Sequence, residues 1–410
     1  MVSFFLFLRR GSFSFSLFLL CLLPVLCSSQ YYPPSNPRLE KAYVALQAWK
    51  RAITADPKNV TGNWCGPHVC NYTGVYCAPA PDDPCQITVA GIDLNHDALQ
   101  GTLPEELGLL ADLAVFHLNS NGFRGTLPAS FKGLRLLYEL DISNNQFEGG
   151  FPSVVLELHS LRYLDIRYNR FCGGVPSCLF DLRLDALFIN NNDFTFSIPD
   201  NIGNSPVSVL VFADNQINGC FPKAIANMRD TLRELIIMNV GLRACIPPEI
   251  GQLTKLRVLD LSYNHLVGHL PASIGDMKKL EQLDVAHNKL SGEIPCGICD
   301  LPRLKNFTYS YNFFCEEPES CLRIRRHDDR LNCFPFRPLQ RPAEQCAAFL
   351  SKPKFCDSNG SQRSERVNLL RGFEADANLR RREVHLMWLD NRDLSSSSYS
   401  GNESTREIPT

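Results

Sequence analysis

The chain is 410 residues long, with 44% hydrophobic and 20% charged residues and a formal net charge of −2. That apolar fraction supports a folded core, and the length fits two or three ordinary domains or one elongated repeat array. A near-neutral chain lacks the basic composition typical of nucleic-acid-binding proteins, so we expect no nucleic-acid partner.

Residues 1–29 have the layout of a secretory signal peptide, with Arg9 and Arg10, an apolar run over 17–26, and then two serines. The run is too short to span a bilayer and no later apolar stretch is long enough, so we predict a secreted, extracellular protein without a membrane span. The 17 cysteines suit an oxidising compartment. Removing the leader removes two of the 17 and leaves 15, so one thiol stays unpaired or links two chains into a disulfide-bonded homodimer.

Residues 30–86 are predicted to form an N-terminal cap. Asn36 and Pro37 are a typical N-cap and first-turn pair, and apolar residues follow them at helical spacing. Cys70 and Cys77 form a C-x6-C pattern, which we expect to close a small loop by a disulfide over the first turn of the following segment.

Residues 87–320 repeat the phrase Leu-x-Leu-x-x-Asn-x-Leu-x-Gly, clearest at 259–268 (LDLSYNHLVG) and 283–292 (LDVAHNKLSG). Its Asn position recurs every 23 to 25 residues, at Asp97, Asn121, Asn145, Asn169, Asn192, Asn215, Val240, Asn264, Asn288 and Asn312. Ten such units predict an α/β leucine-rich repeat solenoid of about ten plant-type 24-residue repeats with a curved parallel β-sheet. We expect local irregularity where Val240 replaces Asn and where Phe196 replaces Gly.

After the repeats, residues 321–356 place Cys321, Cys333, Cys346 and Cys356 among prolines and are predicted to form a Cys-rich C-terminal cap. Residues 357–410 are polar and Arg-rich, and we predict a disordered tail. Cys220 and Cys245 occupy matching positions in adjacent units, which favours a disulfide between neighbouring turns. Cys296 and Cys299 lack the second pair that a zinc site needs, so we interpret them as structural and predict no metal site and no cofactor.

The side chains that point away from the solenoid core lie two, four and six residues before each Asn position, and they define a concave face. Acidic and aromatic residues dominate this set and its strand exits, and only one base, Arg167, occurs among them. The predicted ligand-binding residues are Asp93, His117, Glu139, Asp141, Tyr163, Asp165, Phe188, Asp214, Glu234, Asp260, Tyr263 and Asp284. Asp165 and Asp260 are expected to be solvent-facing, so that Asn substitutions there would barely affect folding.

Charge counts by segment favour a basic partner for this face. Residues 30–320 hold 31 acids and 23 Lys/Arg, a net charge of −8, whereas residues 321–410 hold 12 acids and 16 Lys/Arg, a net charge of +4. A basic tail that folds back onto the face is a competing explanation. Asp between leucines is also common in such strands for solubility alone.

Sequons at Asn59, Asn71, Asn306 and Asn359 predict N-glycosylation, and a further one occurs at Asn402. A glycan on Asn306 would lie at the C-terminal end of the concave face. We predict no enzymatic activity, because an open sheet offers no closed pocket and the sequence has no G-x-S-x-G or HExxH motif.

Several segments resemble the plant leucine-rich repeat extensin family: residues 36–50 (NPRLEKAYVALQAWK), 74–80 (GVYCAPA), 89–96 (VAGIDLNH), 306–314 (NFTYSYNFF) and the spaced cysteines of the C-terminal cap. The resemblance covers about residues 36–356. It implies a protein of the cell wall that binds small, basic, disulfide-bonded rapid alkalinization factor peptides, as a dimer, in control of wall integrity and expansion. The family's Ser-Pro-Pro-Pro-Pro extensin region is not found after Cys356.

Two alternatives stay open at this point. A polygalacturonase-inhibitor-like protein would use the same acidic face against a basic wall-degrading enzyme, although such inhibitors lack the long basic cap found here. A passive structural wall glycoprotein would need no ligand, and the missing hydroxyproline-rich repeats count against it.

Overall fold

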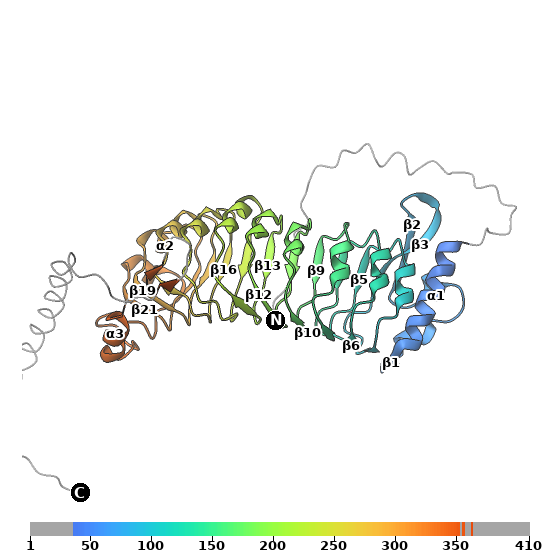
Figure 1. The fold of residues 1–410 in the computed structure, drawn as a ribbon, viewed down its shortest axis with the longest axis horizontal. Helices are drawn as coiled ribbons and strands as arrows, with labels where there is room; N and C mark the ends of the chain where they lie inside the picture. Colours follow the sequence, from blue (N-terminus) through green and yellow to red (C-terminus); the bar gives the residue numbers. More distant parts are fainter. Residues whose placement is uncertain (1–35, 353–354, 357–361, 364–410) are drawn as a thin grey trace, which may run out of the picture.

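The computed structural model describes residues 36–352, 355–356 and 362–363 and shows an elongated, curved solenoid. Helix α1 (Pro37–Ala52) covers one end and helix α3 (Ala343–Leu350) lies at the other (Figure 1). No helix of the described part is long and apolar enough to cross a membrane. The predicted signal peptide, and nearly all of the predicted tail, lie outside the described residues.

A 12-stranded sheet runs the length of the molecule and forms the concave face. Strands β2 and β3 pair antiparallel, and every later pairing in this sheet is parallel, as the repeat predicts. In order, its strands are β2 (Val75–Ala80), β3 (Asp83–Asp93), β5 (Val115–His117), β7 (Glu139–Asp141), β9 (Tyr163–Asp165), β11 (Ala186–Phe188), β13 (Val209–Val211), β15 (Glu234–Ile236), β16 (Val258–Asp260), β18 (Gln282–Asp284), β20 (Asn306–Thr308) and β22 (Arg326–Asp328).

A second layer of short strands follows the turn after each Asn position, and it is broken at the seventh unit. Its first sheet contains β1 (Ile53–Ala55), β4 (Gln100–Gly101), β6 (Gly122–Gly125), β8 (Gln146–Gly149), β10 (Arg170–Gly173), β12 (Asp193–Ser197) and β14 (Gln216–Asn218). A separate sheet then contains β17 (Val267–Gly268), β19 (Lys289–Glu293) and β21 (Phe313–Glu316). The break falls in the unit of Val240, so the predicted irregularity is confirmed there. Two further strands, β23 (Phe355–Cys356) and β24 (Gln362–Arg363), pair with each other.

Short 3₁₀ helices return the chain from the second layer to the next strand of the concave sheet. A proline immediately precedes nearly all of those in the repeats, because its fixed φ ends the extended segment and its missing N–H costs nothing at a helix start. They are η3 (Glu105–Leu109), η4 (Ala129–Gly133), η5 (Ser153–Glu157), η6 (Ser177–Asp181), η7 (Asp200–Asn204), η8 (Lys223–Asp230), η9 (Pro248–Gln252), η10 (Ala272–Asp276) and η11 (Glu319–Arg323), with the short helix α2 (Cys296–Cys299) in the tenth unit.

A ladder of buried asparagines connects each turn to its neighbours. Asn288, only 5% exposed, donates from Nδ2 to the carbonyls of Leu261, Val285 and Ala286 at 2.9, 3.1 and 3.2 Å, and its Oδ1 accepts from the N–H of Leu266 at 2.9 Å. The same pattern recurs at Asn145, Asn169, Asn192, Asn215, Asn264 and Asn312. One amide therefore hydrogen-bonds to four backbone groups of a bent, buried chain and ties neighbouring turns together.

Val240 shows what happens when the amide is missing. The N–H of Ile217, which would bond to an Asn Oδ1 in a regular unit, bonds instead to the backbone carbonyl of Val240 at 2.8 Å. Among the described residues the second-layer strand is missing from this unit, so the break coincides with the loss of the amide.

The N-terminal cap seals the first turn with aromatic side chains. The side chain of Asn36 accepts hydrogen bonds from the N–H groups of Arg38 and Leu39, which confirms the predicted start of α1. Trp49, fully buried, packs with ring centroids 5.7 Å from Trp64 and 5.6 Å from Phe116. Two additional 3₁₀ turns, η1 (Val60–Asn63) and η2 (Val69–Asn71), lie in the cap, and the Cys70–Cys77 disulfide ties η2 to β2 as predicted.

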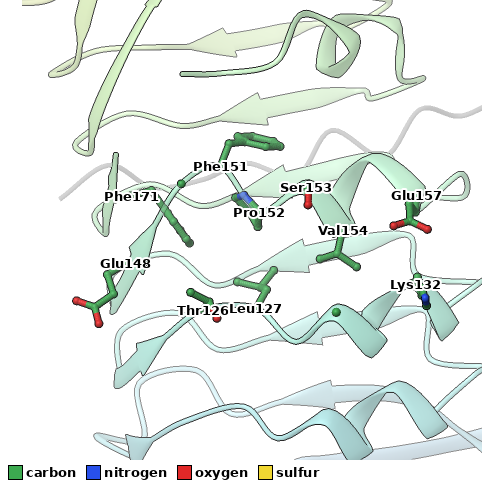
Figure 2. Close-up of a pocket in the computed structure, with 12 residues that line it drawn as sticks. Thr126, Leu127, Lys132, Glu148, Phe151, Pro152, Ser153, Val154, Glu157 and Phe171 are labelled. Atoms are coloured by element: carbon green, nitrogen blue, oxygen red, sulfur yellow. The ribbon is translucent and has the colours of Figure 1, made fainter. Parts of the chain in front are cut away.

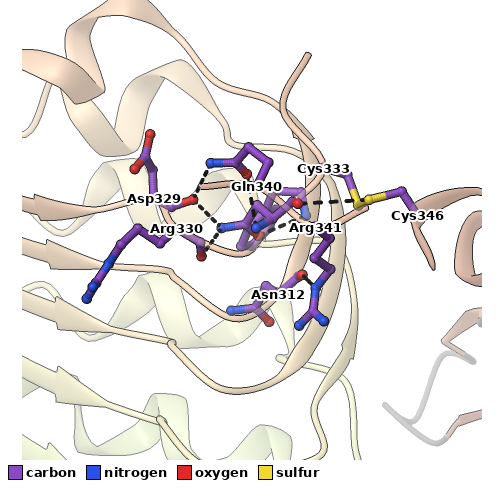
Figure 3. The surroundings of a disulfide bond; sticks show 9 residues. Asn312, Asp329, Arg330, Cys333, Gln340, Arg341 and Cys346 are labelled. Atoms are coloured by element: carbon purple, nitrogen blue, oxygen red, sulfur yellow. Dashed lines mark hydrogen bonds between the residues drawn. A yellow bond between two sulfur atoms is a disulfide. The ribbon is translucent and has the colours of Figure 1, made fainter. Parts of the chain in front are cut away.

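The C-terminal cap begins with one more turn of the solenoid. Strand β22 pairs parallel with β20, and Asn332, 20 residues after Asn312, takes the ladder role by accepting from the N–H of Phe314 and donating to the carbonyl of Tyr309, both at 3.1 Å. Arg341 Nε donates to the Asn312 carbonyl at 2.7 Å, close to the Cys333–Cys346 disulfide (Figure 3). The ring of Phe349 in α3 stacks on Phe313 at 3.6 Å.

The remaining disulfide predictions have mixed outcomes. Cys299 bonds to Cys321 and links the last repeat to the cap, so its role is structural. The predicted Cys220–Cys245 disulfide is wrong, because Cys245 is disulfide-bonded but its partner is not Cys220. The prediction assumed a regular seventh unit, whereas Cys245 lies in an isolated β-bridge with Val267, only 22 residues further on.

Removing one ladder amide tests how much the fold depends on it. We expect Asn288→Leu to lower the free energy of unfolding by about 2–4 kcal/mol, because buried backbone donors and acceptors lose their partners. The measurement is urea unfolding with the disulfides intact, and the control is Gln146→Leu, which removes an exposed amide from β8. Equal stability of both variants would contradict a structural role for the ladder.

Candidate ligand-binding face

Neighbouring strands of the concave sheet are paired in register, so their outward side chains form columns about 4.8 Å apart. The central Leu or Phe of each strand points into the core, and the residues before and after it point to the concave face. Ten of the predicted ligand-binding residues occupy these outward positions, while Asp214 and Tyr263 lie at the turns that follow β13 and β16. The structure thus places all twelve on this side of the solenoid, mostly in two groups, with Phe188, Asp214 and Glu234 between them.

The first group extends from β3 to β9. It contains Asp93, which is exposed, and Glu139, Asp141 and His117, which are half-buried. His117 Nε2 lies 3.1 Å from Glu139 Oε2 on the neighbouring strand. Asp141 and Asp165 are direct neighbours in the register of β7 and β9.

Asp165 differs from the expectation, because its side chain is completely buried and is not solvent-facing. Arg167 Nε lies 3.1 Å from its carboxylate, and the Tyr163 hydroxyl donates to it at 3.4 Å. The guanidinium of Arg167 also covers the Phe188 ring, 5.1 Å from its centroid. Burial, together with the repulsion of Asp141, raises the pKa of Asp165 to about 7 despite the opposing charge of Arg167.

The aspartates after the central leucine share a backbone role. One oxygen of each accepts a hydrogen bond from the N–H two residues later, at 2.9 Å in Asp141, Asp260 and Asp284. The fold does not require an acid there, since His117, Phe188 and Val211 occupy the same column. Each carboxylate therefore keeps a second oxygen for the concave face, and Asn in its place retains the backbone bond.

An apolar patch separates the two acidic groups, and the sequence analysis did not identify it. Phe188, Val211 and Ala213 are its buried members, and Ala186, Val209, Ile236, Met238 and Tyr163 pack around them. The sequence does contain the pattern that predicts this patch, because consecutive units in this region carry apolar residues at the outward positions. Attention to acidic and aromatic residues alone concealed it.

Two polar side chains at the border of this patch, Asn190 and Glu234, each have a polar group without a partner among the described residues. Asn190 is 7% exposed, follows β11 at an outward position, and its Oδ1 has no hydrogen-bond partner among the described residues. Glu234 is half-buried between Val209 and Val258 in the register, and its carboxylate makes no ion pair within residues 36–352. A buried acceptor and an unpaired acid beside apolar surface are what a ligand with N–H donors would satisfy.

The second acidic group extends from β16 to β22. Asp260, Asp284 and Asp328 lie in one column, with Thr308 between the last two, and burial raises the pKa of Asp284 to about 6. Beside them, His287 is stacked between Tyr263 and Tyr311, with ring centroids 4.1 and 3.9 Å apart. Burial lowers the pKa of His287, so the stack carries no charge at neutral pH.

Asp214 is held by neighbouring turns of the solenoid, and the glycosylation sites differ in how exposed they are. Asp214 accepts from Asn191 and Asn239 on the flanking turns, at 2.8 and 2.7 Å, so its carboxylate is already used within the solenoid. Asn59 and Asn71 are exposed, Asn306 is a half-buried outward residue of β20, and Asn359 lies outside the described residues.

A cavity of about 300 Å³ lies away from the concave face, between loops of adjacent repeats (Figure 2). Phe151, Phe171 and Val154 supply apolar lining, while Glu148, Glu157 and Lys132 lie around its rim (Figure 2). Its lining holds no histidine or cysteine, and no nucleophile is paired with a base. This site gives no support for catalysis.

The raised pKa of Asp165 has a consequence for stability. Between about pH 4 and pH 7 the folded state holds a proton on Asp165 that the unfolded state has lost, so this residue costs progressively more stability as pH rises through that window. We expect the free energy of unfolding of Asp165→Asn, relative to the unchanged chain, to rise between pH 5 and 7.5 by up to about 1.4 kcal/mol per pH unit. Urea unfolding at four pH values measures this difference.

The comparison between variants matters because His265 and His287 have lowered pKa values, which act in the opposite direction over part of the range. Their effect is common to both chains and cancels in the difference. Asp93→Asn, at an exposed position of the same column, is the matched control for the removal of one carboxylate. A flat difference for Asp165→Asn would contradict the buried, raised-pKa state.

Comparisons with known proteins agree with the architecture. The family model for leucine rich repeats matches residues 111–171 and 230–290, and the model for the leucine rich repeat N-terminal domain matches residues 41–78. Among solved structures, the ectodomain of the Arabidopsis receptor kinase HAESA, in complex with the peptide hormone IDA and the co-receptor SERK1, is 25% identical with a TM-score of 0.58, over 71% of this chain and 54% of that one. A plant ice-binding protein is 26% identical with a TM-score of 0.58, over 67% of this chain and 87% of its own. One fold thus serves unrelated functions.

Curated relatives identify the family. The Arabidopsis thaliana leucine-rich repeat extensin-like protein 6 is 66% identical over 332 residues, which is 80% of this chain and 71% of the relative. Leucine-rich repeat extensin-like protein 7 of the same plant is 58% identical over 79% of this chain and 75% of its own length, whereas the match to leucine-rich repeat extensin-like protein 3, at 59% identity, spans only 42% of that relative. On this evidence the chain belongs to the leucine-rich repeat extensin-like family.

Proposed function

We propose that this chain is an extracellular peptide-binding protein of the plant cell wall, without enzymatic activity, that captures a small, basic, disulfide-bonded peptide of the rapid alkalinization factor type and acts in wall integrity and expansion. The observation that carries the proposal is the order of surfaces on the concave face: an acidic group, an apolar patch, and a second acidic group. The HAESA ectodomain, which shares the fold, was solved with a peptide hormone.

The apolar patch would supply most of the affinity. The half-buried members Val209, Ile236 and Met238 leave apolar surface open to ligand side chains, and burial of apolar area is the main source of binding free energy. The orphan Oδ1 of Asn190 lies at its border and can accept a ligand N–H. A disulfide-bonded peptide fits this role, because its shape is fixed before binding and less conformational entropy is lost.

The two acidic groups would orient the peptide and accelerate its arrival. Asp93, Asp141 and Glu139 lie before the patch, and Asp260 and Asp284 lie after it, so basic residues at both ends of a ligand can each meet a carboxylate. Such partly exposed pairs contribute modestly to affinity but strongly to the association rate and to its salt dependence.

Calorimetry with a synthetic, oxidised rapid alkalinization factor peptide tests the proposal. We expect the Asp141→Asn, Asp260→Asn double variant to bind about tenfold more weakly at low salt, with a smaller effect at high salt. The control is Glu148→Gln, Glu157→Gln, which removes two carboxylates from the rim of the cavity in Figure 2 and should change nothing. If the unchanged chain does not bind the peptide, inhibition of a fungal polygalacturonase becomes the function to assay.

The same binding should depend on pH. Asp165 and Asp284, with pKa values of about 7 and about 6, lose their negative charge as pH falls from 7.5 to 5, so affinity for a basic peptide should fall with it. Asp284→Asn should reduce the difference between the two pH values. Affinity that stays constant across this range would contradict a role for the buried carboxylates in binding.

We also propose a disulfide-linked homodimer in the cell wall. Cys65 and Cys85 are exposed thiols of the N-terminal cap, where a second chain can reach them. Electrophoresis of the secreted protein with and without reductant distinguishes a covalent dimer from a monomer, and loss of the dimer band in Cys65→Ser or Cys85→Ser identifies the residue.

A further inference from the structure

A shallow cavity of about 320 Å³ on the lateral edge of the solenoid is lined entirely by cationic side chains: Arg233, Lys255, Arg257, Lys279 and Arg303. We call these five residues the basic edge. They belong to units seven to ten and lie just before the strands of the concave sheet, outside the acidic groups described above. The ligand-binding residues predicted from sequence include none of them.

The basic edge is arranged as two ladders along the solenoid axis. In the inner ladder, the N–H of Arg257 bonds to the carbonyl of Arg233 at 2.7 Å, the N–H of Glu281 to that of Arg257 at 2.8 Å, and the N–H of Lys305 to that of Glu281 at 2.9 Å. The outer ladder consists of Lys255, Lys279 and Arg303, each two residues earlier in its own unit and 24 residues from the next. In the outer ladder positive charges therefore recur at the strand spacing of about 4.8 Å, whereas Glu281 interrupts the inner ladder.

Counting the adjacent Lys305, three of the six cations have an acidic partner within the chain and three have none among the described residues. Glu281 lies 3.8 Å from Arg257 and 2.7 Å from Lys305, and Asp230 lies 3.6 Å from Lys255. Arg233, Lys279 and Arg303 are exposed and make no ion pair with any residue of the part that the structure describes. With Lys305 the edge has six cations against two carboxylates.

The fold does not require cations at this edge. The backbone positions equivalent to Arg233 in the first six units hold Ala90, Ala114, Tyr138, Arg162, Asp185 and Ser208. Like charges on neighbouring strands repel and cost stability. Three of the last four units have a cation at this position, and units eight to ten add a second cation two residues earlier, whereas five of the first six units have no cation at the equivalent position. This concentration of positive charge indicates binding of an anion.

We propose that the basic edge binds a linear acidic polysaccharide whose carboxylates repeat along its chain, laid along units seven to ten. The outer ladder, with a cation in each of three consecutive units, matches a ligand that carries a charge on each successive sugar, whereas a single small anion would contact only two or three of the six cations. The cavity lining contains no aromatic side chain on which a nucleobase could stack, which disfavours nucleic acid. This proposal is independent of peptide capture, because the edge and the concave face present different residues.

The test uses the full secreted chain and immobilised polygalacturonate, with a neutral glucan of similar length as the reference surface. We expect saturable binding to polygalacturonate that weakens steeply with salt, and no binding to the glucan. Lys255→Gln, Lys279→Gln, Arg303→Gln together should weaken binding at least tenfold. The matched control Arg124→Gln, Arg135→Gln, Arg170→Gln removes three exposed cations from other positions of the solenoid and should retain binding.

Thermal unfolding of both triple variants verifies that they fold. Equal losses in the two variants, or binding to the neutral glucan, would overturn the proposal. The proposal would also be overturned if inorganic phosphate competed as strongly as soluble polygalacturonate when the phosphate and carboxylate concentrations are equal. A site for any simple anion would behave in that way. Stronger competition by dextran sulfate than by polygalacturonate would overturn the assignment to carboxylates, and competition by single-stranded DNA alone would overturn the assignment to a polysaccharide. Peptide binding, measured separately and without any polyanion, reports on the concave face.

Discussion

The structure depends on a requirement of backbone hydrogen bonding. A chain that turns sharply after a three-residue strand leaves carbonyl and N–H groups inside the solenoid, where water cannot reach them. In most units a buried asparagine hydrogen-bonds to four of them at once, and a residue in the left-handed region immediately before it, such as Asn144 or Tyr168, makes the turn possible. Because these units meet the requirement through the same few positions, the remaining positions are released from it. The concave face and the lateral edge are made from those released positions.

That division explains both the successes and the failures of prediction from sequence. The period, the helical cap starting at Asn36 and the Cys70–Cys77 disulfide follow from local rules, and the structure has them. The Cys220–Cys245 pairing required regular geometry between two units, and the seventh unit, which has Val240 in place of Asn, is irregular. Asn332 escaped notice because its unit is only 20 residues long and lacks the leucines of the others.

For the binding face, sequence alone identified which side chains point outward but not how exposed they are. Asp165 satisfies the outward pattern and is nevertheless buried, because Arg167 and Tyr163 close over it. Burial arises from neighbours on other strands, which a linear pattern does not contain. The apolar patch was overlooked for a related reason: an outward valine appears unremarkable singly, and becomes a surface only when Val209, Val211 and Ile236 are placed side by side.

The small net charge of the chain conceals a separation of charge that only the three-dimensional arrangement shows. On the seventh unit, Arg233 belongs to the basic edge and the next residue, Glu234, to the concave face, so consecutive residues contribute opposite charges to two adjoining surfaces. The same alternation continues through Arg257 and Asp260 in the eighth unit. At a Debye length of about 8 Å, surfaces this close influence each other's potential, so occupation of the edge by a polyanion would neutralise the cations nearest the face and increase the attraction of the face for a basic peptide. Two ligands of opposite charge would then favour each other's binding without any change in the shape of the solenoid, because the coupling is carried by charge alone.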